Sequence, residues 1–320
     1  MIDFRYHLVS LASVLIALAV GIVLGAGPLK EDIGNTLTTQ VTQLRGEKDA
    51  LRADLDAATK VSTARDQFET ELLSRMVAGE LASKRVALVV LPGAETTVVD
   101  QVSAALKDSG ADLAEPIVVN KSWVEGAEDK VAARTEVGNA LLEDASLPPV
   151  GEDGGQSVDS VLAAALTGKV SASALRDPLT TSARRALFDG LVEADLVADS
   201  DAVGKPVDGV VVIAGTVDET GDAGVAQTKS RLALAATVDR TSEGAVLTED
   251  TTKVADQALS PLAVARDQKA LSKGLSTVDA PHLAMGQVDV VLALAEQFDG
   301  GEGHYGVRAD ATAALPGLGR

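Results

Sequence analysis

The side chains best suited to metal or redox chemistry are few in this 320-residue sequence. Transition metals prefer the sulfur of Cys and Met and the imidazole of His, and the chain has no Cys, three Met and three His. His282 and Met285 are three residues apart at the start of a predicted helix, a spacing that puts both on one face. His304 lies in the glycine-rich segment Gly300–Gly306. These three residues are the metal-ligand candidates, with packing as the alternative role for each.

The first predicted strand is not followed by a nucleotide-binding motif, and no catalytic motif was identified. No GxGxxG follows the first predicted strand, Arg85–Leu91, and neither a GxxxxGK[ST] loop nor a GxSxG elbow is present. The acidic pairs Asp218/Glu219 and Glu249/Asp250 are adjacent in sequence and not positioned to face each other, so we interpret them as solvated surface. The sequence therefore predicts a protein that is not an enzyme and has no resident cofactor.

Two strongly apolar runs predict the framework that would position a site. Arg85–Leu91 and Gly209–Ala214 are rich in Val, as is typical of strands buried on both faces of a parallel sheet. Shorter strand candidates are Ile117–Val119, Ala245–Leu247 and Ser276–Val278. Helical periods separate these strands. The fold class predicted is α/β, with a Rossmann-like, mostly parallel sheet of roughly four or five strands and helices on both faces.

Ligands of open parallel sheets bind beyond the carboxyl ends of the strands. The first places to look are therefore Leu91–Gly93 and the acidic loop Gly215–Gly224. Neither segment carries a recognisable binding motif. Helices are predicted around the sheet over 128–142, 157–166, 179–197 and 283–298.

The longest uncharged stretch is Leu8–Ala26, which is long enough to cross a bilayer as one helix. Arg5 precedes it and the mixed charges of Lys30–Asp32 follow it, which favours a cytoplasmic N-terminus and an extracytoplasmic body. A cleaved secretory peptide is the alternative, because small residues stand near the end of the stretch. The apolar run is longer than such peptides require, so we predict a retained single-pass anchor over residues 1–28.

Small residues recur every four positions along this stretch, at Ser13, Ala17, Gly21 and Gly25. Such a stripe lets a second helix approach closely, and its two glycines form a GxxxG motif. Small residues are also common in membrane helices in general, so self-association and composition explain the stripe equally well. On the first interpretation these four residues form a dimer contact within the membrane.

Apolar residues at alternating three- and four-residue spacing follow the anchor and predict a coiled-coil stalk over residues 29–80, ahead of a globular domain over 81–320. Lys48 and Arg65 interrupt the stripe. An amphipathic helix folded back onto the body would show the same pattern. We expect instead a parallel homodimer through the stalk. Its predicted seam residues are Leu44, Leu51, Leu55, Phe68 and Leu72.

The amino-acid composition of the chain limits the kinds of partner that it can bind. The net charge of -19 excludes a general nucleic-acid binder and disfavours adhesion to anionic lipid headgroups. The absence of Cys means that an extracytoplasmic body would have to be stable without disulfides, which its size allows. The expected partners are therefore the membrane, a second copy of the chain and another protein of the envelope.

Several stretches together resemble one known family. They are Ile2–Ser10, Leu24–Leu29, Leu275–Asp279, Gly286–Leu294 and Gly303–Gly306. The chain resembles the MctB-like copper transporter family of actinobacteria over its whole length, with anchor, coiled coil and α/β body in the same order. The resemblance implies a role in copper homeostasis or efflux at the cell envelope, and links to envelope and cell-separation functions with a protein partner. Copper as a ligand enters through this resemblance alone.

The resemblance implies a role in copper homeostasis, but it does not imply that this chain forms a copper pore by itself. A pore made by this chain alone would need several spanning helices or alternating strands of about ten residues with aromatic girdles. The sequence has one apolar span, one Trp and two Tyr. We therefore expect an anchored, oligomeric protein of copper homeostasis that acts through partners, in the cell membrane or, alternatively, the outer membrane. The other hypothesis is a non-enzymatic adaptor of envelope or division machinery without copper chemistry.

Overall fold

The structure is a computed structural model that describes residues 4–26, 28–148, 157–169, 178–254, 256–268 and 273–317. The chain forms two compact units, Met1–Arg65 and Asp66–Arg320. The first unit is helical, and the second contains a seven-stranded sheet with helices packed against it.

The first unit begins with the apolar helix α1 (Phe4–Ala26). Among the described residues, α1 is the one helix that is long and apolar enough to cross a membrane. Helix α2 (Pro28–Val77) begins in this unit and ends in the second. The predicted N-terminal apolar helix is therefore confirmed. Gly27, which the sequence places at the end of the anchor, lies outside the described residues.

The second unit alternates strands and helices along the chain. Its strands are β1 (Arg85–Val90), β2 (Asp112–Leu113), β3 (Ile117–Val118), β4 (Gly209–Ala214), β5 (Gly244–Glu249), β6 (Ser276–Asp279) and β7 (His304–Tyr305). Its further α-helices are α3 (Thr96–Asp108), α4 (Lys121–Val124), α5 (Glu128–Asp144), α6 (Ser157–Thr167), α7 (Thr181–Glu193), α8 (Gly221–Thr241), α9 (Pro261–Asp267) and α10 (Ala284–Phe298). Short 3-10 helices cover Thr251–Lys253 and Gln257–Leu259.

Every strand pairing in the sheet is parallel, which requires the crossover connections that the helices supply. The strand order is β2-β1-β4-β5-β6-β7, and β3 also pairs with β1. The predicted α/β class and parallel sheet are confirmed. The prediction of four or five strands is too low, because β2 and β7 are two residues long and arise from pairing with a neighbour rather than from an apolar run.

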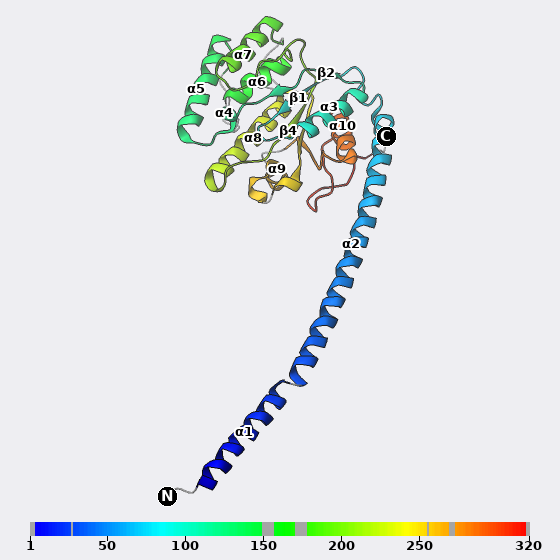
Figure 1. Ribbon diagram of the computed structural model, residues 1–320. Coiled ribbons are helices and arrows are strands. Elements are labelled where there is room, and N and C mark those ends of the chain that lie inside the picture. The colour runs from blue at the N-terminus through cyan, green and yellow to red at the C-terminus, as the bar shows by residue number, and fades with distance from the viewer. Residues whose placement is uncertain are drawn as a thin grey trace. The chain divides into compact units, whose positions relative to one another are not determined.

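Side chains of β1 alternate between two hydrophobic cores, one on each face of the sheet. Ala87 and Val89 point into the core that helices α4 to α9 close. Val86 and Leu88 point into the other core. Helices α3 and α10, which close that core, lie on the opposite side of the sheet from α8 (Figure 1). The prediction of helices on both faces is confirmed.

The C-terminal turns of α2 belong to the second of these cores. Leu73 and Val77 are 6% and 0% exposed and pack with Leu81 in the same cluster as α3 and α10. Leu72, which the sequence places on the coiled-coil seam, is half-buried. The last part of the predicted stalk therefore contributes apolar side chains to the globular unit.

Glu249 corrects the interpretation of the acidic pairs as solvated surface. It ends β5 and is 1% exposed, and its Oε2 accepts hydrogen bonds from Ser260 Oγ (2.6 Å) and the Leu262 amide (3.2 Å) at the start of α9. Burial raises the pKa of Glu249 to about 7. Asp250 is only partly exposed and lies against His282. For Asp218 and Glu219, which are exposed, the interpretation is confirmed.

Asp289 lies within α10, whose neighbouring residues are also buried. It is 0% exposed, and neither carboxylate oxygen has a hydrogen-bond partner among the described residues. Burial, with the nearby charge of Asp279, raises the pKa of Asp289 to about 8. An ionised carboxylate without partners is strongly unfavourable in an apolar environment, so Asp289 is a neutral carboxylic acid at neutral pH.

We expect the fold to lose stability as the pH rises from about 4 to about 8, because the folded chain retains protons on Asp289 and Glu249 that the unfolded chain has released. Asp289→Asn removes the largest of these titrations and should raise the free energy of unfolding at pH 8 by roughly 2–5 kcal/mol, with little change near pH 4. Urea unfolding of the full chain in detergent micelles, followed at both pH values, measures this difference.

Asp310 provides the control of opposite sign. Its pKa is lowered to about 2, chiefly by the hydrogen bond from Arg308, so its ionised form stabilises the fold above about pH 4. Asp310→Asn should therefore destabilise the protein at pH 8. If Asp289→Asn were less stable than the unchanged chain at pH 8, Asp289 would not be the neutral acid inferred from its burial.

Candidate functional site

The order in which the chain adds strands to the sheet reverses between β1 and β4. The chain leaves β1 through α3 on one face and continues to β2, whereas it leaves β4 through α8 on the other face and continues to β5 on the opposite side. Such a switch point is where open α/β sheets bind ligands. A cavity of about 350 Å³ lies there, lined by both predicted loops through Pro92, Gly93 and Thr216. We refer to it as the switch-point cavity.

Two glycines allow the loops after β1 and β4 to touch. A side chain at Gly215 would overlap backbone atoms of Pro92, Gly93 and Ala94. Gly93 has a φ of +84°, and the Thr216 amide donates a hydrogen bond to its carbonyl at 3.3 Å. This close backbone approach is the reason for glycine at both positions, and it fixes the wall of the cavity.

An ion pair crosses the switch-point cavity between segments that are 97 residues apart. Lys121 Nζ, at the start of α4, lies 2.7 Å from Asp218 Oδ2 in the loop before α8. The contact lowers the pKa of Asp218, with a further hydrogen bond from Gln227 acting in the same direction, and raises the pKa of Lys121. Both side chains are more than half exposed, so this pair orients the two segments more than it stabilises them.

Arg231 of α8 holds the two loops together from beneath. Its guanidinium is 1% exposed and donates from Nη1 to the Pro92 carbonyl (3.4 Å) and from Nη2 to the Thr216 carbonyl (3.2 Å). Burial lowers the pKa of Arg231 to about 10. Its Nε and the Oε1 of Gln227, also buried, have no hydrogen-bond partner among the described residues. Both atoms are enclosed by protein, so neither faces the cavity although both residues line it.

The two loops of the switch-point cavity were predicted from the sequence as the first places to look for a ligand. Lys121, Gln227 and Arg231 were not predicted to line it. These residues lie on helices, and no motif connects them. The available signal was Arg231 itself, a charged residue directly before Leu232, which the helical pattern of α8 assigns to the buried side.

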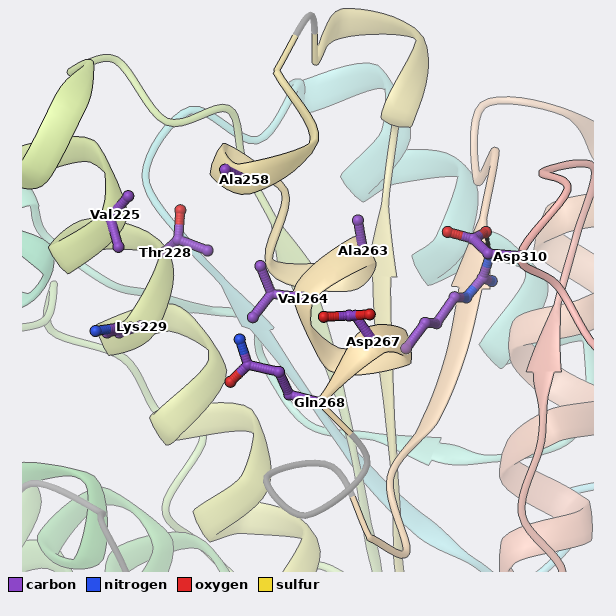
Figure 2. Close-up of a pocket in the computed structure, with 10 residues that line it drawn as sticks. Val225, Thr228, Lys229, Ala258, Ala263, Val264, Asp267, Gln268 and Asp310 are labelled. Atoms are coloured by element: carbon purple, nitrogen blue, oxygen red, sulfur yellow. Dashed lines mark hydrogen bonds and ion pairs between the residues drawn. The ribbon is translucent and has the colours of Figure 1, made fainter.

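A second cavity, of about 560 Å³, lies between α8 and α9. Figure 2 shows Thr228 and Lys229 of α8 on one side, and Val264 of α9 with Gln268, which follows that helix, on the other. Its charged residues are Lys229, Arg266, Asp267 and Asp310, and Arg266 and Asp310 form an ion pair at 2.8 Å. The cavity is therefore lined by charged, polar and apolar side chains.

Arg266 is the centre of a buried polar network that attaches the C-terminal segment to the sheet. Its side chain is 2% exposed and donates to Asp279 Oδ2 (2.9 Å), Thr277 Oγ1 (2.9 Å) and the Tyr305 carbonyl (2.7 Å). Asp279 also accepts from the Val307 amide at 2.8 Å. The ionic groups are paired and hydrogen-bonded, as buried charges must be, so this network is structural.

The three metal-ligand candidates lie in separate local contacts. His282 Nδ1 is 3.1 Å from Asp250 Oδ1, at ion-pair distance although outside hydrogen-bond geometry. Met285 is half-buried on α10. His304 Nδ1 lies 3.0 Å from Thr277 Oγ1, beside the Arg266 network. Within the described part of the chain, no group of three or more His, Cys, Asp or Glu side chains could hold a metal ion.

The glycines of the segment Gly303–Gly306 have a packing role. A side chain at Gly303 would overlap the Tyr305 ring, and one at Gly306 would overlap the Asp279 carboxylate. Tyr305 is 5% exposed, and its hydroxyl donates a hydrogen bond to Glu296 of α10. The segment therefore closes the core beside β6.

The predicted membrane stripe lies on α1. Ser13, Ala17, Gly21 and Gly25 are all exposed, and the Ser13 hydroxyl donates to the Val9 carbonyl at 2.8 Å. A side chain at Gly21 or Gly25 would have nothing within 4 Å. The fold of a single chain therefore places no steric requirement for glycine at these two positions.

Most predicted seam residues of α2 are exposed apolar side chains. The exposed fractions are 63% for Leu44, 69% for Leu51, 66% for Leu55 and 63% for Phe68. Exposed side chains of this size, repeated along one helix, are unfavourable in water without a partner.

Comparison with known proteins gives a consistent result over the whole chain. Residues 1–316 match the family described as "Copper transport outer membrane protein, MctB". The copper transporters MctB of Mycobacterium tuberculosis and Mycobacterium bovis are each 30% identical over 319 residues, which cover 96% of this chain and of the relative. Copper transporter MctB of Mycobacterium leprae is 26% identical over 318 residues, or 98% of both chains.

Proposed function

Because the chain belongs to the MctB family, described as copper transport outer membrane proteins, we propose that it serves copper homeostasis or efflux at the cell envelope. In this proposal it is a membrane-anchored protein that acts by assembling with copies of itself and with envelope partners. The match over residues 1–316 is the observation that carries the proposal.

The architecture supports a role through assembly. Among the described residues, α1 alone is long and apolar enough to span a membrane. The strands of the second unit are at most six residues long, pair in parallel and are covered by helices on both faces. Such a body has its apolar surface inside and suits water rather than lipid. Copper passage through the membrane would then depend on an assembly of chains or on a partner.

We place the anchor in the cell membrane, with the N-terminus in the cytoplasm and the α/β body outside. Arg5 precedes the apolar helix, and a chain without Cys has no thiols for an oxidising compartment to modify. One apolar α-helix is sufficient for such an anchor because all of its backbone hydrogen bonds lie within the segment. The outer membrane named in the family description is the alternative location.

Copper is the cargo in this proposal rather than a resident cofactor. A selective copper site requires several soft or imidazole ligands, and His282 and His304 are each in contact with a different neighbour, Asp250 and Thr277. Copper ligands would then be supplied jointly by several chains or by a partner. On this proposal neither histidine is required for the function.

Self-association is supported by the two apolar features that a single chain leaves uncovered. Gly21 and Gly25 provide a close-approach surface on α1, and Leu44, Leu51 and Leu55 provide a stripe on α2. A parallel pair of chains can bury both features, the first within the lipid bilayer and the second outside it. We propose a parallel homodimer through anchor and stalk.

The copper function is tested in a strain that lacks this protein. We expect the deletion to increase copper sensitivity, and the unchanged chain and the His282→Ala/His304→Ala double variant to restore resistance. Gly21→Leu/Gly25→Leu should fail because the bulky side chains prevent close approach of α1 helices. Val20→Leu, on the same helix, is the control. Growth curves over a copper series measure the result.

Two outcomes would contradict the copper proposal. Normal copper sensitivity of the deletion strain, together with a cell-separation defect, would point to an adaptor without copper chemistry. Loss of resistance in the double histidine variant at unchanged protein level would show that the histidines take part in copper binding directly.

The dimer is tested by cysteine crosslinking, which is unambiguous because the native chain has no Cys. Leu44→Cys, Leu51→Cys and Leu55→Cys should each form disulfide dimers in membranes, since seam side chains of a parallel coiled coil face their counterparts. Arg52→Cys, one residue beyond a seam position, should crosslink poorly. Non-reducing gels measure the dimer fraction. Equal crosslinking at all four positions, or a monomeric mass by light scattering, would rule the stalk dimer out.

A further inference from the structure

Residues 37–58 of α2 form a regular heptad pattern. Steps of three and four residues alternate along this stretch, which assigns its positions to the letters a to g of a coiled-coil heptad. The a and d positions are Leu37, Val41, Leu44, Lys48, Leu51, Leu55 and Ala58, and all are exposed in a single chain. Exposed apolar side chains in this pattern favour burial against another helix, and the charges beside them indicate which helix fits.

The two flanks of this apolar face carry opposite charges. The g positions, directly before each a residue, are Gln40, Glu47 and Asp54, so this flank is acidic. The e positions, directly after each d residue, are Thr38, Arg45, Arg52 and Thr59, so this flank is basic. In coiled coils, the charges at e and g set the choice of partner and its direction.

These charges are not paired with one another within the chain. Among the described residues, no ion pair includes a side chain of residues 37–65. Glu47 accepts one hydrogen bond, from Gln43 at 2.9 Å. Lys48 and Arg52 are four residues apart, and like charges at that spacing on a helix are unfavourable. A carboxylate from outside the chain, placed beside both cations, would remove this repulsion.

The direction of a partner helix decides which charges meet. A parallel partner brings each g position against the e position of the following heptad, whereas an antiparallel partner brings g against g and e against e. In a parallel pair, Glu47 therefore meets the partner subunit's Arg52. In an antiparallel pair, acidic flank would meet acidic flank and basic flank would meet basic flank, which is unfavourable. A parallel copy of the same helix is therefore the partner whose charges match.

We propose that residues 37–58 bind a parallel, in-register second copy of this chain, and that Glu47 of each chain forms ion pairs with the partner subunit's Arg52 and the partner subunit's Lys48. Lys48 occupies an a position, where one polar residue specifies register at a cost in stability. The inference rests on the proposed homodimer and adds the charges that select the partner. Two chains anchored in one membrane present α2 in this parallel direction.

The first test measures disulfide dimers of the full-length chain in membranes, with Leu37→Cys at the seam as the reporter. This position is ten residues from Glu47, so a charge change at Glu47 leaves the thiol itself unaffected. Glu47→Arg puts like charges on both sides of the dimer and should reduce the dimer about threefold or more, as expected for two exposed ion pairs. Asp49→Arg makes the same charge change at an outward position and should crosslink like the reporter alone.

The second test restores the pairing in two ways. The double variant Glu47→Arg/Arg52→Glu exchanges the two charges and should recover the dimer. Two differently tagged chains, one with Glu47→Arg and one with Arg52→Glu, match each other but not themselves. When they are produced together, mixed dimers should exceed the proportion of about one half that random pairing gives, and the excess should shrink in about 1 M salt because exposed charges are then screened.

The outcomes separate this inference from the homodimer itself. If the Leu37→Cys chain crosslinks and Glu47→Arg behaves like Asp49→Arg, the dimer stands and the charge pairing is wrong. Random pairing of the two tagged chains, or no recovery in the double variant, would also overturn the charge pairing alone. If the Leu37→Cys chain with unchanged charges forms no dimer, both the inference and the stalk dimer are wrong.

Discussion

The rest of the second unit depends on covering the two apolar faces of β1 and β4. Both strands are nearly continuous aliphatic runs, and their alternating side chains enter two separate cores. A strand that is apolar on both sides cannot form the surface of a soluble sheet, so each face must receive helices. The parallel connections follow from the same constraint, because a helical crossover both reverses the chain and covers a face.

Polar groups are concentrated where this apolar covering ends. Arg231 lies beyond the carboxyl ends of β1 and β4, and Glu249 and Asp279 end β5 and β6. Each is buried, and each accepts or donates hydrogen bonds that fix a loop or the start of a helix. This is how buried charges persist in a protein with an aliphatic core.

The first unit presents the opposite situation. Its apolar side chains, on α1 and along α2, are exposed in a single chain. The apolar length of α1 matches a bilayer, and the stripe of α2 matches a second helix. The family match and the length of α1 agree on an association with a membrane, and the stripe of α2 is an apolar surface that a single chain leaves exposed.

The sequence by itself determined the features that burial imposes at a fixed local spacing. The apolar anchor, the runs of β1 and β4, most helices, the α/β class and the family were all predicted from residues near one another in the chain. Only the tertiary structure decided which distant residues meet. Lys121 and Asp218 are 97 residues apart, and Arg231 and Pro92 are 139 apart. Such contacts produce no periodic pattern in the sequence, because the strand order rather than the sequence spacing brings these residues together. For the same reason the interpretation of Glu249 as solvated surface was wrong: the start of α9, eleven residues further along the chain, supplies its hydrogen bond from Ser260.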